Sequence, residues 1–399
     1  MLHGNELTIA GEGRTVHLPL VDTGKSGRHI WHDNSTKEQD MNPLLAVKEQ
    51  GQHIWLDNLS RTLLQEGALK RLVEEDGVNG VTSNPSIFHK AVSESPYYKD
   101  DLERLKASAM DAEARYEALA IPDIRAACDM LRAVHQATSG DTGYVSLEVS
   151  PHLAHDEDGT VAAARHLKAE VARDNLLVKV PATAAGIRAF ERLTAEGINV
   201  NVTLMFSVRH ENAVGQAYIR GARRWVDGGG DPRALKSVAS IFLSRVDTLV
   251  DKKLDALGTP EALGLRGKSA VAMAKIAYRR YREMFHGADF AGLAGLGVRP
   301  QYPLWASTGT KNPAYSDLLY VEPLIGPETV NTVPDATLAA FRRHGKVART
   351  VDTGLEEALQ QAAALAALDI NLADAGEQLQ AEGVGSFVEA YDKLLGLMG

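Results

Sequence analysis

The chain lacks most features that mark secreted or membrane-spanning proteins. It contains a single cysteine, Cys128, so no disulfide can form within one chain and a reducing compartment is the simpler setting. The amino-terminal stretch has neither the basic start nor the apolar core of a signal peptide. No uncharged apolar run approaches the ~18 residues that a membrane span needs. We therefore expect a cytoplasmic protein that does not cross a membrane.

Excess positive charge is also absent. The net charge of −9 at pH 7 argues against a general nucleic-acid binder, which needs a basic face to release counterions from phosphate. A small anionic substrate remains compatible with this charge, because a few local cations suffice to bind it. With 399 residues, the chain is long enough for one barrel with extra helices or for two or three domains.

The first 40 residues differ from the rest of the chain. They are rich in Gly, Asp, Ser, Thr and His and show little periodicity, so we expect residues 1–40 to form a poorly ordered extension. Within them, LTIAGEGRTVHLPLV has the pattern of a short hairpin. The segment that begins at Met41 is typical of the start of a domain, which places the main domain at residues 41–399.

Short apolar segments alternate with helical patterns from residue 52 onward. Such strands, buried on both sides and separated by helices, predict a parallel sheet, and eight of them predict a closed (β/α)8 barrel of the α/β class. A doubly wound sheet is less well supported because no G-x-G-x-x-G follows a strand. Further helices are expected within residues 86–140 and after the eighth strand. The eight predicted strands are 53–57, 78–84, 144–149, 176–182, 198–205, 236–243, 301–309 and 320–326.

Lys179 stands out because it lies inside an apolar strand, in LLVKVP. A lysine is almost never fully buried without a partner, and burial favours the neutral amine that attack on a ketone requires. The alternative is a structural lysine paired with a core carboxylate. Glu148, on the preceding strand, would serve as the partner in either case, so periodicity alone leaves both roles open.

Other polar residues lie at the carboxyl ends of strands, where barrel enzymes carry their working residues. Asp57 and Glu148 offer two carboxylates for acid–base chemistry. Thr203 either fixes a water molecule or is simply a β-branched strand residue. Arg245 and Lys311 are cations suited to a phosphate: each alone is more often a solvated surface charge, but together they suggest that an anionic sugar end binds here. The remaining polar candidates at strand ends are Asn84, Asn201, Ser240 and Ser307.

Six motifs on six successive predicted strands resemble those of one family. The segments IWLDNLSR, GVTSNPSIF, VSLEVSP, LLVKVPAT, INVNVTLMFS and ASIFLSRVD, in this order, are similar to transaldolases. The resemblance runs from about residue 41 to the end and is to the longer bacterial type, related to the transaldolase half of fusions with glucose-6-phosphate isomerase. It implies a TIM barrel of the class I aldolase type with additional helices.

The resemblance also implies roles for the catalytic candidates. Lys179 matches the lysine that forms a Schiff base with the C2 carbonyl of a ketose phosphate. Asp57 matches the residue that takes the C4 hydroxyl proton as the C3–C4 bond cleaves. Glu148 and Thr203 match the pair that holds the catalytic water. Since the lysine imine accepts the electrons, the resemblance implies no metal and no organic cofactor.

The substrate contacts follow in the same way. Asn84, Asn201 and Ser240 match groups that bind the dihydroxyacetone unit, and Arg245 matches a phosphate-binding arginine. Many transaldolases carry a second phosphate arginine two residues past the strand-seven serine, here Ser307. Thr308 and Gly309 follow it instead, so Lys311 is the expected substitute.

The implied reaction transfers dihydroxyacetone from sedoheptulose 7-phosphate to glyceraldehyde 3-phosphate, giving erythrose 4-phosphate and fructose 6-phosphate. The alternative is a fructose-6-phosphate aldolase, which releases free dihydroxyacetone. Those enzymes have Gln in place of the water-holding Glu and a Tyr near the strand-six site, whereas this chain has Glu148 and Phe242. The expected partners are sugar phosphates only, in a monomer or a homodimer.

Overall fold

The computed structural model describes residues 6–11, 14–19 and 42–399 of the chain, which divides into units 1–40 and 41–399. In the first unit, β1 (Glu6–Gly11) pairs antiparallel with β2 (Arg14–Pro19), which confirms the predicted hairpin. The poor order predicted for residues 1–40 concerns positions that lie largely outside the described residues.

The second unit is a closed barrel of eight parallel strands, so the predicted (β/α)8 fold is confirmed. The last strand pairs with the first, and every other strand pairs with its neighbours in chain order. Because all strands run the same way, their carboxyl ends meet at one mouth of the barrel and their amino ends at the other. The strands are β3 (Gln52–Asp57), β4 (Gly80–Thr82), β5 (Tyr144–Glu148), β6 (Leu176–Pro181), β7 (Val200–Met205), β8 (Ser237–Phe242), β9 (Tyr302–Ala306) and β10 (Thr329–Val333).

The position predicted for the eighth strand was wrong. Residues 320–326 were expected to form it, but they contain the 3-10 turn η4 (Glu322–Leu324), and the strand is β10, further along the chain. Pro323 explains why the first segment does not pair, since proline has no N–H for a sheet ladder. The polar Asn331 interrupts the apolar pattern of TVNTV, yet all five residues of this strand are buried.

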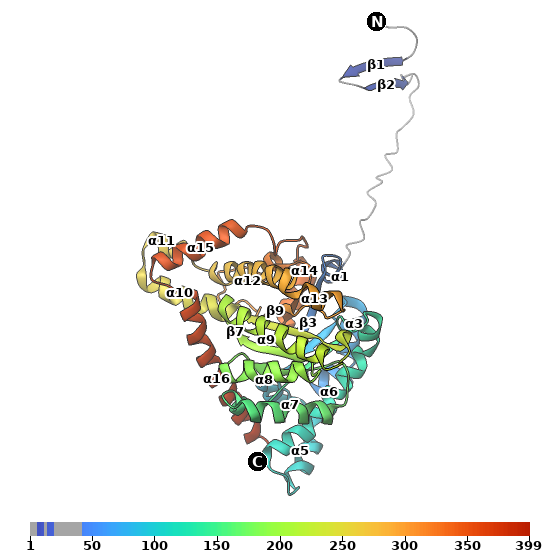
Figure 1. Cartoon of the computed structure of the whole chain (residues 1–399), viewed down its shortest axis with the longest axis vertical. Helices are drawn as coiled ribbons and strands as arrows, with labels where there is room; N and C mark the ends of the chain where they lie inside the picture. Colours follow the sequence, from blue (N-terminus) through green and yellow to red (C-terminus); the bar gives the residue numbers. More distant parts are fainter. Residues whose placement is uncertain (1–5, 12–13, 20–41) are drawn as a thin grey trace, which may run out of the picture. The chain divides into compact units, whose positions relative to one another are not determined.

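Helices surround the barrel and follow the strands in chain order, as α7, α8, α9 and α12 show in Figure 1. The helices predicted within residues 86–140 and after the last strand are all present, and Cys128 is buried in one of them. None of the helices in the described part is long and apolar enough to cross a membrane. The helices are α1 (Pro43–Glu49), α2 (Arg61–Gln65), α3 (Ala68–Asp76), α4 (Pro85–Glu94), α5 (Lys99–Lys106), α6 (Ala112–Ala137), α7 (Glu157–Val171), α8 (Ala184–Ala195), α9 (Val208–Asp227), α10 (Ser244–Leu257), α11 (Pro260–Leu263), α12 (Ser269–Phe285), α13 (Ala288–Gly295), α14 (Asp335–His344), α15 (Leu355–Ala367) and α16 (Leu372–Gly396).

The last helix, α16, packs against the carboxyl end of β7. Gly376 permits this close approach, because a Cβ there would come within 2.8 Å of the Ser207 side chain. The amide of Gln380 donates hydrogen bonds to the carbonyl oxygens of Ala182, at 2.9 Å, and Leu204, at 3.0 Å. A segment remote in sequence therefore borders the mouth of the barrel.

Candidate active site

Lys179 and Glu148 form a buried ion pair at the mouth of the barrel. They lie opposite each other on β6 and β5, and the ammonium group contacts the Glu148 carboxylate. Lys179 also donates a 2.9 Å hydrogen bond to the carbonyl oxygen of Ser83, and the residue is only 5% exposed. The carboxylate partner expected from the sequence is thus present, and it stands where it can take a proton directly from the amine.

A second carboxylate, Asp57, lies at the carboxyl end of β3. It accepts a 2.8 Å hydrogen bond from the Thr82 hydroxyl. Burial raises the pKa of Asp57, although the charge of Lys179 acts in the opposite direction. Burial likewise raises the pKa of Glu148 against the charge of the same lysine. Two carboxyl groups with an increased tendency to hold protons therefore lie near one amine, as proton exchange requires.

Thr203 faces a cavity beside this pair. The cavity has a volume of about 20 Å³ and is lined in part by Glu148, Lys179 and Thr203. Val384 and Phe387 of α16 also line it. The Thr203 hydroxyl is buried and has no hydrogen-bond partner among the described residues. A single water needs roughly 10–15 Å³ and polar partners, so this cavity suits one water molecule.

The backbone around Thr203 is irregular. The register of β7 against β8 shifts between Val202 and Met205, and Leu204 has a φ of 60°, in the left-handed region. A non-glycine residue adopts this conformation only when its surroundings hold it there. The hydrogen bond from Gln380 to the Leu204 carbonyl is one such restraint.

Asn201 and Ser240 lie together inside the barrel. The Ser240 hydroxyl donates a 2.7 Å hydrogen bond to the Asn201 amide oxygen, and the Asn201 NH2 group donates to the Ser146 hydroxyl at 3.1 Å. Asn201 lies opposite Lys179 in the β6–β7 register, so its amide is fixed next to the amine. Asn84, by contrast, is engaged as the N-cap of α4, where its side chain accepts from the Ile87 N–H at 3.0 Å.

The expected phosphate-binding residues follow β8 and β9. Arg245 is partly buried, burial lowers the pKa of its guanidinium group, and no carboxylate within the described residues forms an ion pair with it. The Ser307 hydroxyl is 2.8 Å from that of Ser244, next to Arg245. Lys311 is exposed, and its charge acts to lower the pKa of Asp57. The loop after β9 therefore brings a cation toward the same mouth of the barrel.

Four residues at the site escaped the sequence analysis. Gln380, Val384 and Phe387 lie on α16, which reads as an ordinary amphipathic helix with no local signal for a site. Ser146 carried a usable signal, because it is polar within the buried strand YVSLE. Within the residues that the structure describes, no group of three or more His, Cys, Asp or Glu side chains is arranged to hold a metal ion.

The fold and the site together define a class: an α/β barrel with a buried lysine–carboxylate pair at its carboxyl mouth, where barrel enzymes carry their working residues. The transaldolase/fructose-6-phosphate aldolase family model matches residues 54–398. A transaldolase of Thiobacillus denitrificans is 55% identical over 86% of this chain and 95% of its own length. A transaldolase of Frankia alni is 46% identical over 89% of this chain and 96% of its own length. A transaldolase of Neisseria gonorrhoeae is 47% identical over 94% of this chain and 98% of its own length.

The chain belongs to the transaldolase/fructose-6-phosphate aldolase family, and it is an enzyme of the transaldolase type, a transferase.

Proposed function

We propose that this enzyme transfers a dihydroxyacetone unit from sedoheptulose 7-phosphate to glyceraldehyde 3-phosphate through a Schiff base on Lys179, in the non-oxidative pentose phosphate pathway. The observation that carries the proposal is the Lys179–Glu148 pair beside a cavity that suits one water and is lined by Thr203. A purely structural ion pair has no need of such a cavity or of a nearby second carboxyl group.

In the first step, Glu148 takes a proton from the ammonium group of Lys179. The raised pKa of this carboxyl group, which burial causes, favours that transfer. The free amine adds to the C2 carbonyl of the ketose and gives a carbinolamine. The C2 hydroxyl then leaves as water after protonation through the water held between Glu148 and Thr203, and a cationic imine remains.

In the second step, Asp57 takes the proton of the C4 hydroxyl. The oxygen forms the carbonyl of the departing aldose phosphate, the C3–C4 bond breaks, and its electrons neutralise the imine as an enamine. The enamine carbon then attacks the aldehyde of the acceptor, Asp57 returns its proton, and hydrolysis of the new imine releases fructose 6-phosphate. The raised pKa of Asp57, caused by burial, suits a group that must hold this proton between the two half-reactions.

The rest of the site binds the substrate. Asn201 and Ser240, joined at 2.7 Å, are assigned to the dihydroxyacetone hydroxyls, together with the NH2 group of Asn84. Arg245 is assigned to the phosphate, since a partly buried guanidinium without a carboxylate partner in the described structure gains most from an anion. Ser307, bonded to Ser244, and Lys311 complete this end of the site.

Release of free dihydroxyacetone is the second candidate activity, because the family includes fructose-6-phosphate aldolases. Glu148 argues against it, because the resemblance gives fructose-6-phosphate aldolases a Gln at the position of this carboxylate, which here pairs with Lys179. Phe242 stands where those aldolases carry a tyrosine.

Two measurements test the proposal. In a coupled assay with fructose 6-phosphate, we expect turnover only when erythrose 4-phosphate is supplied as acceptor. Turnover without an acceptor would identify an aldolase. Borohydride reduction in the presence of fructose 6-phosphate should leave a covalent adduct, and peptide mapping should locate it on Lys179. An adduct on another lysine, or none, contradicts the mechanism.

A further inference from the structure

The opposite end of the barrel carries a second cavity, far from the residues proposed for catalysis. Its volume is about 820 Å³. The segments that lead into β5, β6, β7, β8 and β9 contribute to its lining, so it opens at the amino-terminal ends of the strands. Ligand pockets typically occupy ~300–1,000 Å³, and this cavity lies within that range.

The lining is strongly basic, although the whole chain is acidic. Five cationic residues and a single carboxylate, Asp174, line the cavity. The cations are Arg132, Lys168, Arg173, Arg233 and Arg299. Arg132 and Arg173 share one carboxylate, that of Asp129. Within the described residues, the other three have no carboxylate within ion-pair distance. None of the three therefore has a partner at contact distance, and Asp174 is the lining carboxylate whose charge acts on Lys168.

Two of these three cations are held in place by backbone carbonyl groups. The Arg299 guanidinium donates to the carbonyl oxygens of Arg233 and Ser139, and Lys168 Nζ donates to that of Arg173 at 2.8 Å. Carbonyl groups orient a cation without neutralising it. Both residues are half-buried, and burial lowers the pKa of Lys168, so the charged form is poorly solvated here.

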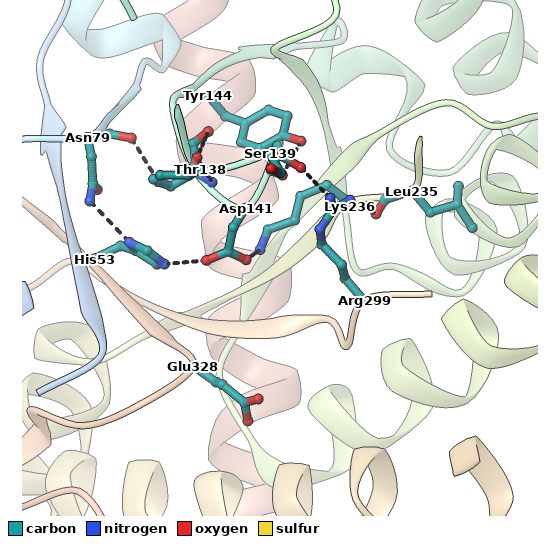
Figure 2. A network of polar contacts seen from close by, with 12 residues as sticks. His53, Asn79, Thr138, Ser139, Asp141, Tyr144, Leu235, Lys236, Arg299 and Glu328 are labelled. Carbon is teal, nitrogen blue, oxygen red and sulfur yellow. Dashed lines mark hydrogen bonds and ion pairs between the residues drawn. The ribbon is translucent and has the colours of Figure 1, made fainter. Parts of the chain in front are cut away.

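The wall that carries Ser139 is itself fixed by a buried network, shown in Figure 2. Asp141, two residues further on, lies 2.9 Å from Lys236 Nζ and 3.0 Å from the ring of His53. Lys236 also packs over the ring of Tyr302 at 3.6 Å. A fixed wall reduces the ordering cost that a ligand must overcome, because Arg299, which donates to the Ser139 carbonyl, is positioned before any ligand arrives.

We propose that this basic cleft binds a small anion that carries two or more phosphate groups. Guanidinium groups match phosphate oxygens with paired hydrogen bonds. The cations come from five places in the chain, on α6, on α7 and in the segments before β6, β8 and β9, around a cavity of about 820 Å³. A di- or triphosphate chain can contact more of them at once than a single phosphate group can. The site does not depend on the proposed transfer reaction, since no residue is shared between them.

Tripolyphosphate is the probe that tests this proposal. The full-length enzyme is titrated by calorimetry at low ionic strength, with Arg245→Gln as the background so that anion binding at the catalytic mouth is weakened. We expect saturable binding with one tripolyphosphate per cleft, weaker inorganic phosphate binding, and lower affinity as salt is added. Parallel titration with ATP distinguishes a nucleotide from a bare phosphate chain, because only a nucleotide site gains affinity from the nucleoside.

Two variants and one control locate the site. Arg233→Gln and Lys168→Gln should each weaken tripolyphosphate binding about tenfold, as expected for loss of one charged contact. Arg343→Gln removes the same charge from an exposed position of α14 that does not line the cleft. This control variant should therefore bind tripolyphosphate as tightly as the Arg245→Gln protein without further changes. Transfer activity of Arg233→Gln, measured in the chain that retains Arg245, should be unchanged, and thermal unfolding confirms that each variant is folded.

His135 gives a second readout, because it lines the same cleft. Burial lowers the pKa of His135, and the charges of Arg299 and Lys168 act in the same direction, against that of Asp174. A bound polyanion should raise this pKa, measured from the His135 ring signal by NMR. The proposal is overturned if tripolyphosphate does not saturate, if all variants bind it equally, or if its binding leaves the pKa of His135 unchanged.

Discussion

The two ends of the barrel each hold a buried lysine paired with a carboxylate, but the two pairs differ in what surrounds them. At the carboxyl mouth, Lys179 contacts Glu148 beside a small cavity, with Asp57 nearby. At the amino end, Lys236 contacts Asp141, and its side chain is completely buried against the ring of Tyr302.

The electrostatics of the carboxyl groups differ as well. Burial raises the pKa of Glu148, so that carboxyl group is ready to accept a proton. Burial also acts to raise the pKa of Asp141, but the hydrogen bond from His53 and the charge of Lys236 outweigh it and hold that pKa well below its usual value. The carboxyl group at the amino end is therefore held in its ionised form, which suits a structural role.

The comparison teaches that a lysine in an apolar strand does not by itself indicate a nucleophile. Burial lowers the pKa of Lys236 to about 8, which alone would make it a candidate. What differs is the partner: Asp141 is held ionised and does not readily take up a proton, whereas burial raises the pKa of Glu148. The surroundings of the amine, rather than its burial, separate the two roles.

The largest effect should come from Lys179→Met. We expect loss of transfer activity by about 10⁴-fold or more, because no other group can form the imine. The fold should survive, since Glu148 can become neutral by taking up a proton. Activity and circular dichroism are measured together, with Lys236→Met as the matched variant at the other end. Comparable activity loss in both folded variants would erase the distinction between the pairs.

Lys236→Met should act on stability instead. It leaves Asp141 with His53 as its remaining partner, and breaking a buried pair of this kind should lower the free energy of unfolding by about 3 kcal/mol. Urea denaturation measures this change, and borohydride trapping on Lys179 should persist at full yield. Lys252→Met, at an exposed position of α10, is the control and should change stability by less than about 0.5 kcal/mol. A Lys236 variant as stable as this control contradicts the structural role.

A smaller effect is expected at Gln380. Gln380→Leu removes both hydrogen bonds to the mouth of the barrel and should loosen the bulge that holds Thr203, lowering kcat about tenfold with little change in KM. Steady-state kinetics and the rate of borohydride trapping measure the effect, which should appear in imine formation. Gln378→Leu, two residues earlier, is the control, because the Gln378 side chain donates to Glu382 of its own helix and, within the described residues, to nothing at the barrel mouth. Equal kcat values for the two variants would remove Gln380 from this positioning role.

The smallest effect concerns acid stability. Because the folded-state pKa of Asp141 lies below the ordinary value of 3.8, its stabilising contribution is present above that value and is lost as the pH falls further. The difference in unfolding free energy between the wild type and Asp141→Asn should therefore shrink by about 1.4 kcal/mol per pH unit below the ordinary value. Denaturation curves of both proteins at successively lower pH measure this difference in unfolding free energy. A difference that stays constant with pH would place the stabilisation elsewhere.

Most of the fold could be predicted from the sequence because each strand and helix has its own pattern of apolar residues. The prediction was wrong at the eighth strand. It placed this strand in the apolar segment that contains Pro323, whereas the strand is the more polar segment around Asn331. Burial of that strand depends on β3 and β9 on either side of it, and on Tyr320, whose carbonyl oxygen accepts from the Asn331 amide. No local pattern carries that information.

The sequence by itself determined which residues stand at the strand ends, because strand period and chain order place Asp57, Glu148, Lys179 and Thr203 at one mouth of any parallel barrel. Only the tertiary structure decided what surrounds them. Three residues of α16 contact this mouth: Gln380, Val384 and Phe387. These contacts join segments that are far apart in the sequence, since Gln380 and Ala182 are separated by 198 residues. The basic cleft likewise forms only when α6, α7 and the segments before β5 to β9 come together, since its cations are scattered along the chain and each alone is typical of a solvated surface.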